Sequence, residues 1–175
     1  MATPEYAIRA AQASELSALQ AIEEVAGQRY GSVGIDPDLP GLPLPTLAAG
    51  QRAGLLWVMV HGRNELVGFA LAWVRPDAVH LREIDVLPAH GGKRLGARLV
   101  DRVASEARMR SLARVTLTTF ADVPWNAPYY ERLGFRRLDD AELPSWLRAI
   151  RAEEHAAGLD TWPRVAMARD VTPNG

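Results

Sequence analysis

The alternation of apolar and polar residues predicts two long amphipathic helices and two short ones. The first apolar stripe follows the helix-capping residue Ser14 and consists of Leu16, Leu19, Ile22 and Val25. The second stripe consists of Leu95, Leu99, Val103 and Ala107. Spacing of this kind predicts helices over 14–27 and 94–109. Shorter helices are expected over 128–133, which begins at a proline, and over 146–157.

Segments rich in Val, Thr and aromatic residues predict the strands. They begin near Ile8 and continue at 55–60, 66–74, 79–87, 114–120, 135–138 and 164–169. A glycine-containing turn at 62–64 predicts an antiparallel hairpin between the second and third of these segments. The segments 79–87 and 114–120 enclose the helix at 94–109, and such a crossover makes its two strands parallel neighbours. The sequence thus predicts an α/β fold with a mixed, mostly antiparallel central sheet and helices on both faces.

Prolines interrupt the pattern between the first helix and the first hairpin. Pro37, Pro40, Pro43 and Pro45 exclude a regular helix or a central strand, so we assign 36–45 to a loop. A loop of this length is either a lid or binding segment or a plain surface crossing. The sequence leaves both interpretations open.

Length and composition indicate a single domain. With 175 residues and 48% hydrophobic content, the chain is long enough for one domain over 1–175, with an ordered core over about 6–170. A net charge of −1 gives no basic field, so nucleic acid and anionic membranes are not expected as partners. The sequence has no apolar run long enough to span a bilayer, and residues 1–10 lack the apolar core of a signal peptide. These features predict a cytoplasmic protein.

The residue types present exclude several kinds of chemistry. The chain has no cysteine, which excludes disulfides, cysteine-ligated zinc and a cysteine acyl-enzyme. The histidines His61, His80, His90 and His155 are scattered without the spacing of metal ligands. We therefore expect neither a thiol nor a metal ion in the active site.

The most informative segment runs from the strand at 79–87 through a glycine-containing turn at 91–96 into the long helix. The first turn of a helix leaves its backbone N–H groups without partners and carries partial positive charge, so it binds a phosphate. A Walker loop is excluded because Ala97 and Arg98 follow the last glycine in place of the Lys and the hydroxyl residue. A dinucleotide fold is disfavoured because the turn lies in mid-chain after an antiparallel hairpin.

Two segments carry a resemblance to a known family. The first is a strand ending in V-x-P with a Q/R-x-x-G-x-G/A turn, and it consists of Val86-Leu87-Pro88 and Gly91-Gly92-Lys93-Arg94-Leu95-Gly96. The second, over 126–135, has an Asn, two tyrosines and a Gly-Phe ending. In both motifs and in the order of its elements, the chain resembles the GNAT superfamily of acyl-CoA-dependent N-acetyltransferases. Gly91 and Arg94 depart from the motif, and Arg94 would add strain if its position required a positive φ.

The resemblance implies acetyl-CoA as the cofactor and a parallel strand pair that splays at the cofactor site. The backbone groups of Val86 and Leu87 would bind the pantetheine arm and the acyl carbonyl. The pyrophosphate would lie on the amides of Gly91, Gly92, Lys93, Arg94, Leu95, Gly96 and Ala97. Asn126 would either bond the pantetheine arm or cap the following helix, and both roles stay open.

The resemblance also implies candidates for the acid and the base. Tyr130 aligns with the family's general acid, whereas the adjacent Tyr129 is expected to pack in the core. An acceptor amine is protonated at neutral pH, so a base should help, and Glu83 stands where relatives often carry a glutamate. Strand alternation places Glu83 and Asp85 on one face. There, either burial and mutual repulsion raise one pKa, which suits a base, or a nearby Arg neutralises the pair as structural support, and both interpretations stay open. The alternative bases are Asp85, Glu23 and Glu24.

The function implied is that of an N-acetyltransferase. It would move an acetyl group from acetyl-CoA to a primary amine of a small-molecule or peptide acceptor, by direct attack in a ternary complex. The alternative is a non-catalytic acyl-CoA-binding sensor module that kept the cofactor cleft and lost turnover. A toxin-type enzyme acting on aminoacyl-tRNA is disfavoured by the net charge of −1. A homodimer is compatible with the resemblance.

Overall fold

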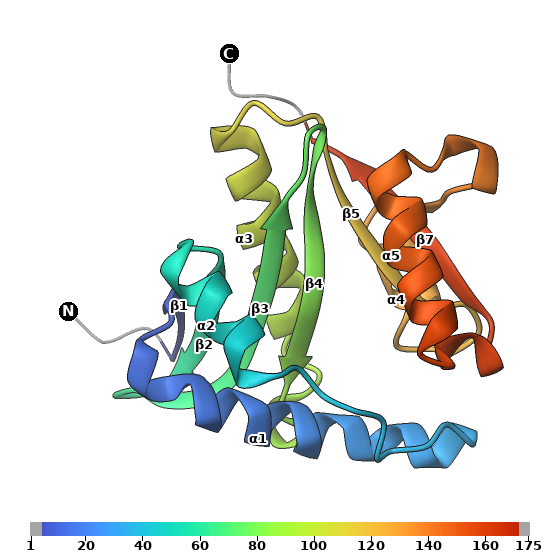
Figure 1. Ribbon diagram of the computed structural model, residues 1–175. Coiled ribbons are helices and arrows are strands. Elements are labelled where there is room, and N and C mark those ends of the chain that lie inside the picture. Colours follow the sequence, from blue (N-terminus) through green and yellow to red (C-terminus); the bar gives the residue numbers. More distant parts are fainter. Residues whose placement is uncertain (1–4, 172–175) are drawn as a thin grey trace. The chain divides into compact units, whose positions relative to one another are not determined.

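The computed structural model describes residues 5–171 and confirms the mixed α/β fold (Figure 1). Within these residues, seven strands form a sheet in the order β1-β2-β3-β4-β5-β7-β6. The strands are β1 (Tyr6–Ala10), β2 (Leu56–His61), β3 (Glu65–Val74), β4 (Ala78–Val86), β5 (Arg114–Phe120), β6 (Arg136–Arg137) and β7 (Arg164–Asp170). The sheet is mostly antiparallel, and β4 and β5 form the parallel pair that the crossover predicts.

Helices flank the strands. The α-helices are α1 (Leu16–Gly27), α2 (Leu44–Arg52), α3 (Leu95–Met109), α4 (Ala127–Arg132) and α5 (Ser145–Ala156). The 3-10 helices are η1 (Ala13–Glu15), η2 (Gln28–Val33), η3 (Pro88–His90), η4 (Asp140–Glu142) and η5 (Leu159–Thr161). A membrane crossing needs a longer and more apolar helix than any found in residues 5–171.

The chain packs as two compact units. In the described chain, the first contains residues 5–73 and 81–103, and the second contains 74–80 and 104–171. The single domain over 1–175 stays a prediction.

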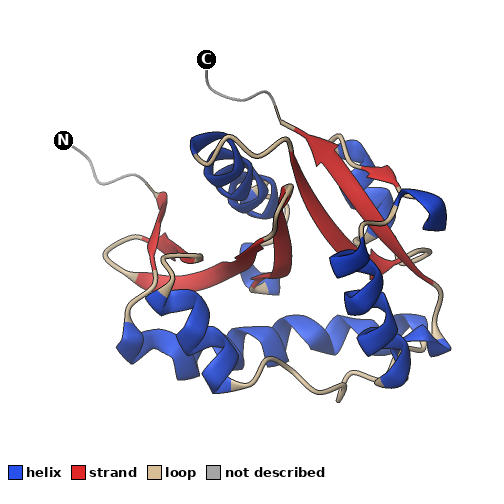
Figure 2. Cartoon of the chain, turned by 45° about the horizontal axis from the view of Figure 1, so that its top comes forward, coloured by secondary structure: helices blue, strands red, loops and turns tan. Residues whose placement is uncertain are grey.

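In the first unit, successive side chains of β2 point to opposite faces of the sheet. One face packs against α1 and α2 in a core that includes Leu19, Leu47, Leu56, Val58 and Val60. Trp57 points the other way, and the guanidinium carbon of Arg102 in α3 lies 4.6 Å from the centroid of its ring. Helices therefore cover both faces of this part of the sheet (Figure 2).

In the second unit, β5 is the central strand. It pairs with β7 in an antiparallel register that sets Leu117 opposite Met167, and with the start of β4 in a parallel register that sets Val79 opposite Val115. Helix α5 adds side chains to a small core that contains Leu138, Leu143, Leu147, Ala166 and Ala168.

The structure differs from the sequence prediction at α2. The loop assigned to 36–45 ends at Pro43, which is the N-cap residue of α2, and Pro45 lies in the first turn of that helix. Proline is tolerated there because the first N–H groups of a helix have no intrahelical partner. Leu47 is fully buried in the core of the first unit, and this packing stabilises a helix too short to persist alone.

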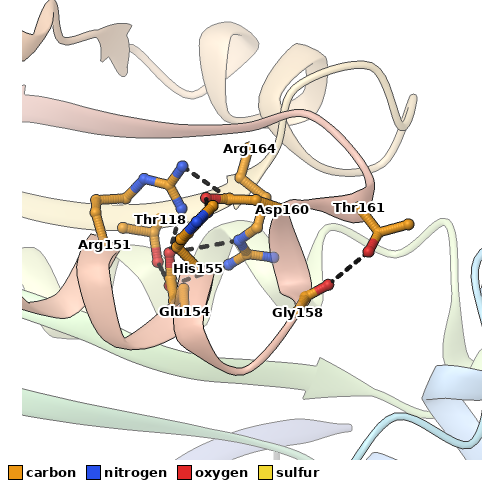
Figure 3. Close-up of polar contacts among 8 residues, drawn as sticks. All are labelled: Thr118, Arg151, Glu154, His155, Gly158, Asp160, Thr161 and Arg164. Atoms are coloured by element: carbon orange, nitrogen blue, oxygen red, sulfur yellow. Dashed lines mark hydrogen bonds and ion pairs between the residues drawn. The ribbon is translucent and has the colours of Figure 1, made fainter.

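A half-buried ion-pair network holds α5 to the strands of the second unit (Figure 3). Glu154 on α5 bonds Arg151 at 2.6 Å and Arg164 of β7 at 3.2 Å. Its Oε1 atom also accepts a hydrogen bond from Thr118 of β5. Burial raises the pKa of Glu154, but the charge of Arg164 and the hydrogen bonds outweigh it, so that the pKa is lowered overall.

Glu154→Gln should lower the free energy of unfolding by about 2 kcal/mol at neutral pH, because a charged hydrogen-bond acceptor is lost between two arginines. A lowered folded-state pKa stabilises the fold above the unfolded-state pKa of about 4.3, and this contribution is lost as the pH falls. The free energies of unfolding of the wild type and of Glu154→Gln, measured by urea unfolding, should therefore converge as the pH falls. Glu153→Gln, an exposed change on the same helix, should alter the stability by less than about 0.5 kcal/mol. Equal losses in both variants would contradict this role of Glu154.

Candidate active site

The chain passes from β4 through the short 3-10 helix η3 and a glycine-containing turn into α3. A hydrogen bond of 3.0 Å from the Gly91 N–H to the Pro88 carbonyl oxygen closes residues 88–91 into a tight turn. Gly92 and Arg94 then adopt positive φ angles of 74° and 59°, and α3 begins at Leu95. The two left-handed residues reverse the chain within a few residues of the strand end.

A row of backbone N–H groups at this helix start has no acceptor among residues 5–171. The row consists of the amides of Gly92, Lys93, Arg94, Leu95, Gly96 and Ala97. The first intrahelical bond of α3 runs from the Arg98 N–H to the Arg94 carbonyl oxygen at 3.1 Å. The dipole of the 15-residue helix adds partial positive charge, so the donor set fits a pyrophosphate. Gly91 was expected in this set, but its amide is already donated to Pro88.

Arg94 is the departure from the motif that has a structural consequence. Its φ of 59° lies in the left-handed region, which costs a residue with a Cβ atom about 1–2 kcal/mol. A glycine, which the motif has at this position, avoids that cost. The conditional expectation of strain at Arg94 is therefore confirmed.

Arg94→Gly should be more stable than Arg94→Ala by about 1 kcal/mol. Both variants lose the same charged side chain, but only glycine relieves the left-handed conformation. Urea titrations give the two free energies of unfolding. Ser111, with φ 55°, offers a matched position away from the turn, where glycine should be preferred over alanine in the same way. Equal stabilities of the two Arg94 variants would show that the turn is not strained.

Lys93 is held beside the turn by β1. Its Nζ atom donates to the Tyr6 hydroxyl at 2.8 Å, and this hydrogen bond raises the pKa of Lys93. The Tyr6 hydroxyl oxygen also lies 3.0 Å from Nδ1 of His90, and Arg98 donates to the Tyr6 carbonyl oxygen at 2.9 Å. The partners are 84 to 92 residues apart in the chain, so no local pattern in the sequence indicates them.

The backbone of Leu87 is less available than the sequence suggested. Its N–H donates to the Val67 carbonyl oxygen of β3 at 2.8 Å, and its carbonyl oxygen accepts from the His90 N–H at 2.9 Å. Successive residues of a strand direct their backbone groups to opposite edges, so those of Val86 point away from β3. Of the two residues predicted to bind the pantetheine arm, Val86 is therefore the better placed.

Two glutamates of the first unit act electrostatically on Asp85, and we call Glu23, Glu83 and Asp85 the carboxylate cluster. The side chain of Glu83 is 29% exposed, and its Oε2 atom lies 3.8 Å from Nη1 of Arg82. Asp85 is half-buried as a residue, but its Oδ2 atom is fully enclosed and accepts no hydrogen bond from residues 5–171. Burial raises the pKa of Asp85 well above its usual value, the two glutamates raise it further, and Arg29 lowers it.

Glu23 is held in place by the segment that precedes α2. Both of its carboxylate oxygens lie 3.0 Å from the Leu42 nitrogen and accept its N–H. The backbone at Gly41 packs so closely that a Cβ atom there would lie 3.0 Å from Oε2 of Glu23. Burial raises the pKa of Glu23, although the Leu42 N–H and the charge of Arg82 lower it. The adjacent Glu24 is exposed on the same helix and is not among the charges that act on Asp85.

In the second unit, Tyr130 is the more buried of the two tyrosines on α4. It is 7% exposed, and its ring meets that of Phe135 edge to face at 5.7 Å. Tyr129 is half-buried, so the expectation that Tyr129 is the core residue was wrong. Asn126 is buried at the N-cap position of α4, but its side chain makes no capping hydrogen bond within the described chain. Capping therefore does not explain Asn126.

Residues 5–171 contain no group of three or more His, Asp or Glu side chains arranged to hold a metal ion. All four histidines have polar neighbours within hydrogen-bond distance, and Nδ1 of His155 lies 3.1 Å from Oδ2 of Asp160. Nδ1 of His80 lies 2.9 Å from Oγ1 of Thr116, and Nδ1 of His61 lies 2.8 Å from Oε2 of Glu65. His90 lies against Tyr6 beside the turn. His61 and His90 thus lie together, with ring centroids 5.3 Å apart, and both rings contact that of Tyr6.

Comparisons with known proteins agree with this geometry. The model of the acetyltransferase (GNAT) family matches residues 18–135. Rv2747 from Mycobacterium tuberculosis, solved in complex with CoA and NLQ, is 20% identical with a TM-score of 0.71, and the match covers 95% of this chain and 99% of that chain. The ribosomal-protein-S18-alanine N-acetyltransferase from Escherichia coli is 21% identical with a TM-score of 0.66, covering 97% and 96%.

A third similar structure belongs to a longer protein. N-acetylglutamate synthase from Neisseria gonorrhoeae, complexed with coenzyme A and N-acetyl-glutamate, is 16% identical with a TM-score of 0.71. The match covers 95% of this chain, but this chain spans only 35% of the length of that one. At these identities the three structures show a shared fold.

Proposed function

The chain belongs to the acetyltransferase (GNAT) family, and we propose that it moves an acetyl group from acetyl-CoA to a primary amine of a small-molecule or peptide acceptor. The observation that supports this most directly is the row of unbonded amides at the start of α3, inside the matched residues 18–135. The sequence has no cysteine for an acyl-enzyme, so the amine attacks the acetyl group directly in a ternary complex.

Backbone groups of the first unit would hold most of the cofactor. The amides of Gly92 to Ala97 would bind the pyrophosphate, and Lys93 and Arg94 would add positive charge. The Val86 N–H, which points away from β3, would bind the pantetheine arm or the acyl oxygen as that oxygen gains charge. Asn126 is assigned to the pantetheine arm by the resemblance alone. When bound, acetyl-CoA supplies the acetyl group as a thioester.

Glu83 is the proposed general base. An acceptor ammonium has a pKa of about 10.4, so reaching its neutral form at neutral pH costs about 4–5 kcal/mol. The Oδ2 atom of Asp85 is enclosed by protein, whereas the side chain of Glu83 is 29% exposed and is therefore the more accessible of the two to an acceptor. Glu83 would first take a proton from the ammonium, so that the neutral nitrogen could bond the acetyl carbon as the carbon–sulfur bond breaks. The second nitrogen proton would leave to solvent as the amide forms.

Tyr130 is the proposed general acid, which would donate its hydroxyl proton to the leaving sulfur. Tyr130→Phe should lower kcat about tenfold, a modest loss because a thiol with a pKa of about 8.5 also leaves without a proton. Steady-state kinetics at saturating acetyl-CoA and amine measure the effect. Tyr129→Phe removes the same hydroxyl from the adjacent residue of α4 and is the matched control. If both variants turned over at the wild-type rate, Tyr130 would have no part in proton transfer.

A thiol-release assay with acetyl-CoA across amine classes tests the proposed function. We expect thiol release that depends on one class of amine. A sensor module would instead be stabilised against heat by CoA without releasing thiol with any amine. The cytoplasmic location and the homodimer stay predictions.

A further inference from the structure

The Tyr6 hydroxyl joins β1, at the edge of the sheet, to the turn that precedes α3. Its oxygen accepts a hydrogen bond from Nζ of Lys93 at 2.8 Å and lies 3.0 Å from Nδ1 of His90. An ammonium group can only donate, so the single hydroxyl proton of Tyr6 remains available for Nδ1 of His90. One phenol thus bonds a residue directly before the turn and a residue within it.

Tyr6 is itself held firmly in the first unit. It is 8% exposed, and it pairs with His61 of β2 in the antiparallel ladder. Its carbonyl oxygen accepts a hydrogen bond from Arg98 of α3 at 2.9 Å. Its ring lies against two imidazoles, with centroids 4.8 Å from that of His61 and 5.8 Å from that of His90. The hydroxyl therefore has a fixed position relative to the start of α3.

Lys93 keeps a donor for a ligand in this arrangement. An ammonium group has three N–H donors. One is directed to Tyr6 at 2.8 Å, and Oε1 of Glu5 lies 3.5 Å from Nζ, which is a long and weak contact. Nζ has no other acceptor in residues 5–171, and the Lys93 side chain is 48% exposed. A third donor is therefore available to an anion that reaches the turn from solvent.

The hydrogen bond to Tyr6 restricts a side chain that is otherwise flexible. A lysine has a four-carbon stem, and it loses rotational freedom when it engages a phosphate. Tyr6 removes part of that freedom before a ligand arrives, because it holds Nζ beside the turn that carries the unbonded amides. Groups that are ordered in advance bind a ligand more tightly than groups that are ordered on binding.

We propose that Tyr6 is a positioning residue for the cofactor, and that its hydroxyl holds Lys93 so that the ammonium group meets a phosphate of CoA. This inference rests on the proposed function. It adds to the cofactor site a residue that lies outside both motifs and outside the matched residues 18–135. His90 supports the arrangement by taking the hydroxyl proton, which leaves the hydroxyl oxygen turned towards Lys93. Tyr6 thus acts through Lys93.

A double-mutant cycle measures this role, because the effect of Tyr6 on CoA binding should disappear when Lys93 is removed. Tyr6→Phe removes the hydroxyl and keeps the ring, whose centroid lies 5.0 Å from Nζ. It should raise the Kd for CoA about fivefold in the wild-type background, and less than about 1.5-fold in a Lys93→Met background. Isothermal titration calorimetry gives the four dissociation constants. Tyr30→Phe removes a hydroxyl that Lys93 does not contact, and it should change the Kd by less than about 1.5-fold.

Steady-state kinetics with acetyl-CoA separate positioning from damage to the fold. Tyr6→Phe should raise KM for acetyl-CoA about fivefold and change kcat by less than about 1.5-fold, because Lys93 contacts the same phosphate before and during acetyl transfer. If Tyr6→Phe does not fold, His90→Leu removes the acceptor of the hydroxyl proton and should raise the Kd for CoA about twofold, only when Lys93 is present.

The outcomes distinguish this inference from the proposed function. Equal effects of Tyr6→Phe in both backgrounds, or no effect in either, would overturn the positioning role alone. The expected coupling in CoA binding without acetylation of any amine would overturn the proposed enzyme and leave the role of Tyr6 standing. A wild-type protein that does not bind CoA would overturn both.

Discussion

Glu83→Gln should lower kcat about 1,000-fold at neutral pH and leave the Kd for acetyl-CoA within about twofold of the wild-type value. The amide cannot accept a proton, but it keeps the size of the side chain. Glu83 is partly exposed beside Arg82, so the substitution neither opens a cavity nor buries an unpaired group. A pH–rate profile measures the effect, and the limb that rises with pH in the wild type should be absent from the variant.

Glu153→Gln is the matched control for this substitution, because it removes one exposed carboxylate from the second unit. It should keep the wild-type rate and pH profile. A Glu83→Gln protein with an intact rate and an unshifted rising limb would exclude Glu83 as the base. Glu23, the other glutamate of the carboxylate cluster, would then be the next candidate.

Gly96→Asp should weaken CoA binding about 100-fold more than Gly96→Asn does, because only the aspartate places a negative charge among the amides at the start of α3. Two like charges about 6 Å apart repel by about 2.8 kcal/mol at an effective dielectric constant of 20, which corresponds to about 100-fold in a dissociation constant. Asparagine has nearly the same shape and therefore controls for crowding of the backbone. Isothermal titration calorimetry at low salt measures both dissociation constants.

The stability of the two Gly96 variants separates loss of binding from loss of fold. A carboxylate in the first turn stabilises a helix through the macrodipole, so Gly96→Asp should unfold at the same temperature as Gly96→Asn or at a higher one. High salt should narrow the difference in CoA affinity, because it screens charges at an exposed site. Equal dissociation constants at low salt would show that the cofactor phosphates do not lie at this helix start.

The elements around the candidate cofactor site could be predicted because their signals are local. The apolar stripe of α3 and the glycines before it lie within one short stretch of sequence. The strain at Arg94 could be stated as a condition, since the residue type at a turn position determines its cost. Helix α2 was missed because its prolines mark a helix start as readily as a loop, and the burial of Leu47 decides between the two.

The properties of the carboxylates and of Lys93 could not be predicted in the same way. Alternation along β4 indicated that Glu83 and Asp85 share a face, but not which of them is enclosed. The pKa of Asp85 also depends on Glu23, whose position is fixed by the Leu42 N–H 19 residues further along the chain. The position of the Lys93 side chain depends on a hydrogen bond to Tyr6, which lies 87 residues away in the chain. Contacts of this kind come from tertiary packing, which a sequence pattern does not encode locally.

Mass spectrometry of amines incubated with the protein and isotopically labelled acetyl-CoA tests the proposed acetyl transfer most directly. We predict that one class of primary amine gains one labelled acetyl group with the wild-type protein, and that far less of it is labelled with Glu83→Gln. Unmodified amines across the whole panel, together with CoA that still raises the unfolding temperature, would contradict the proposed enzyme and identify a sensor module instead.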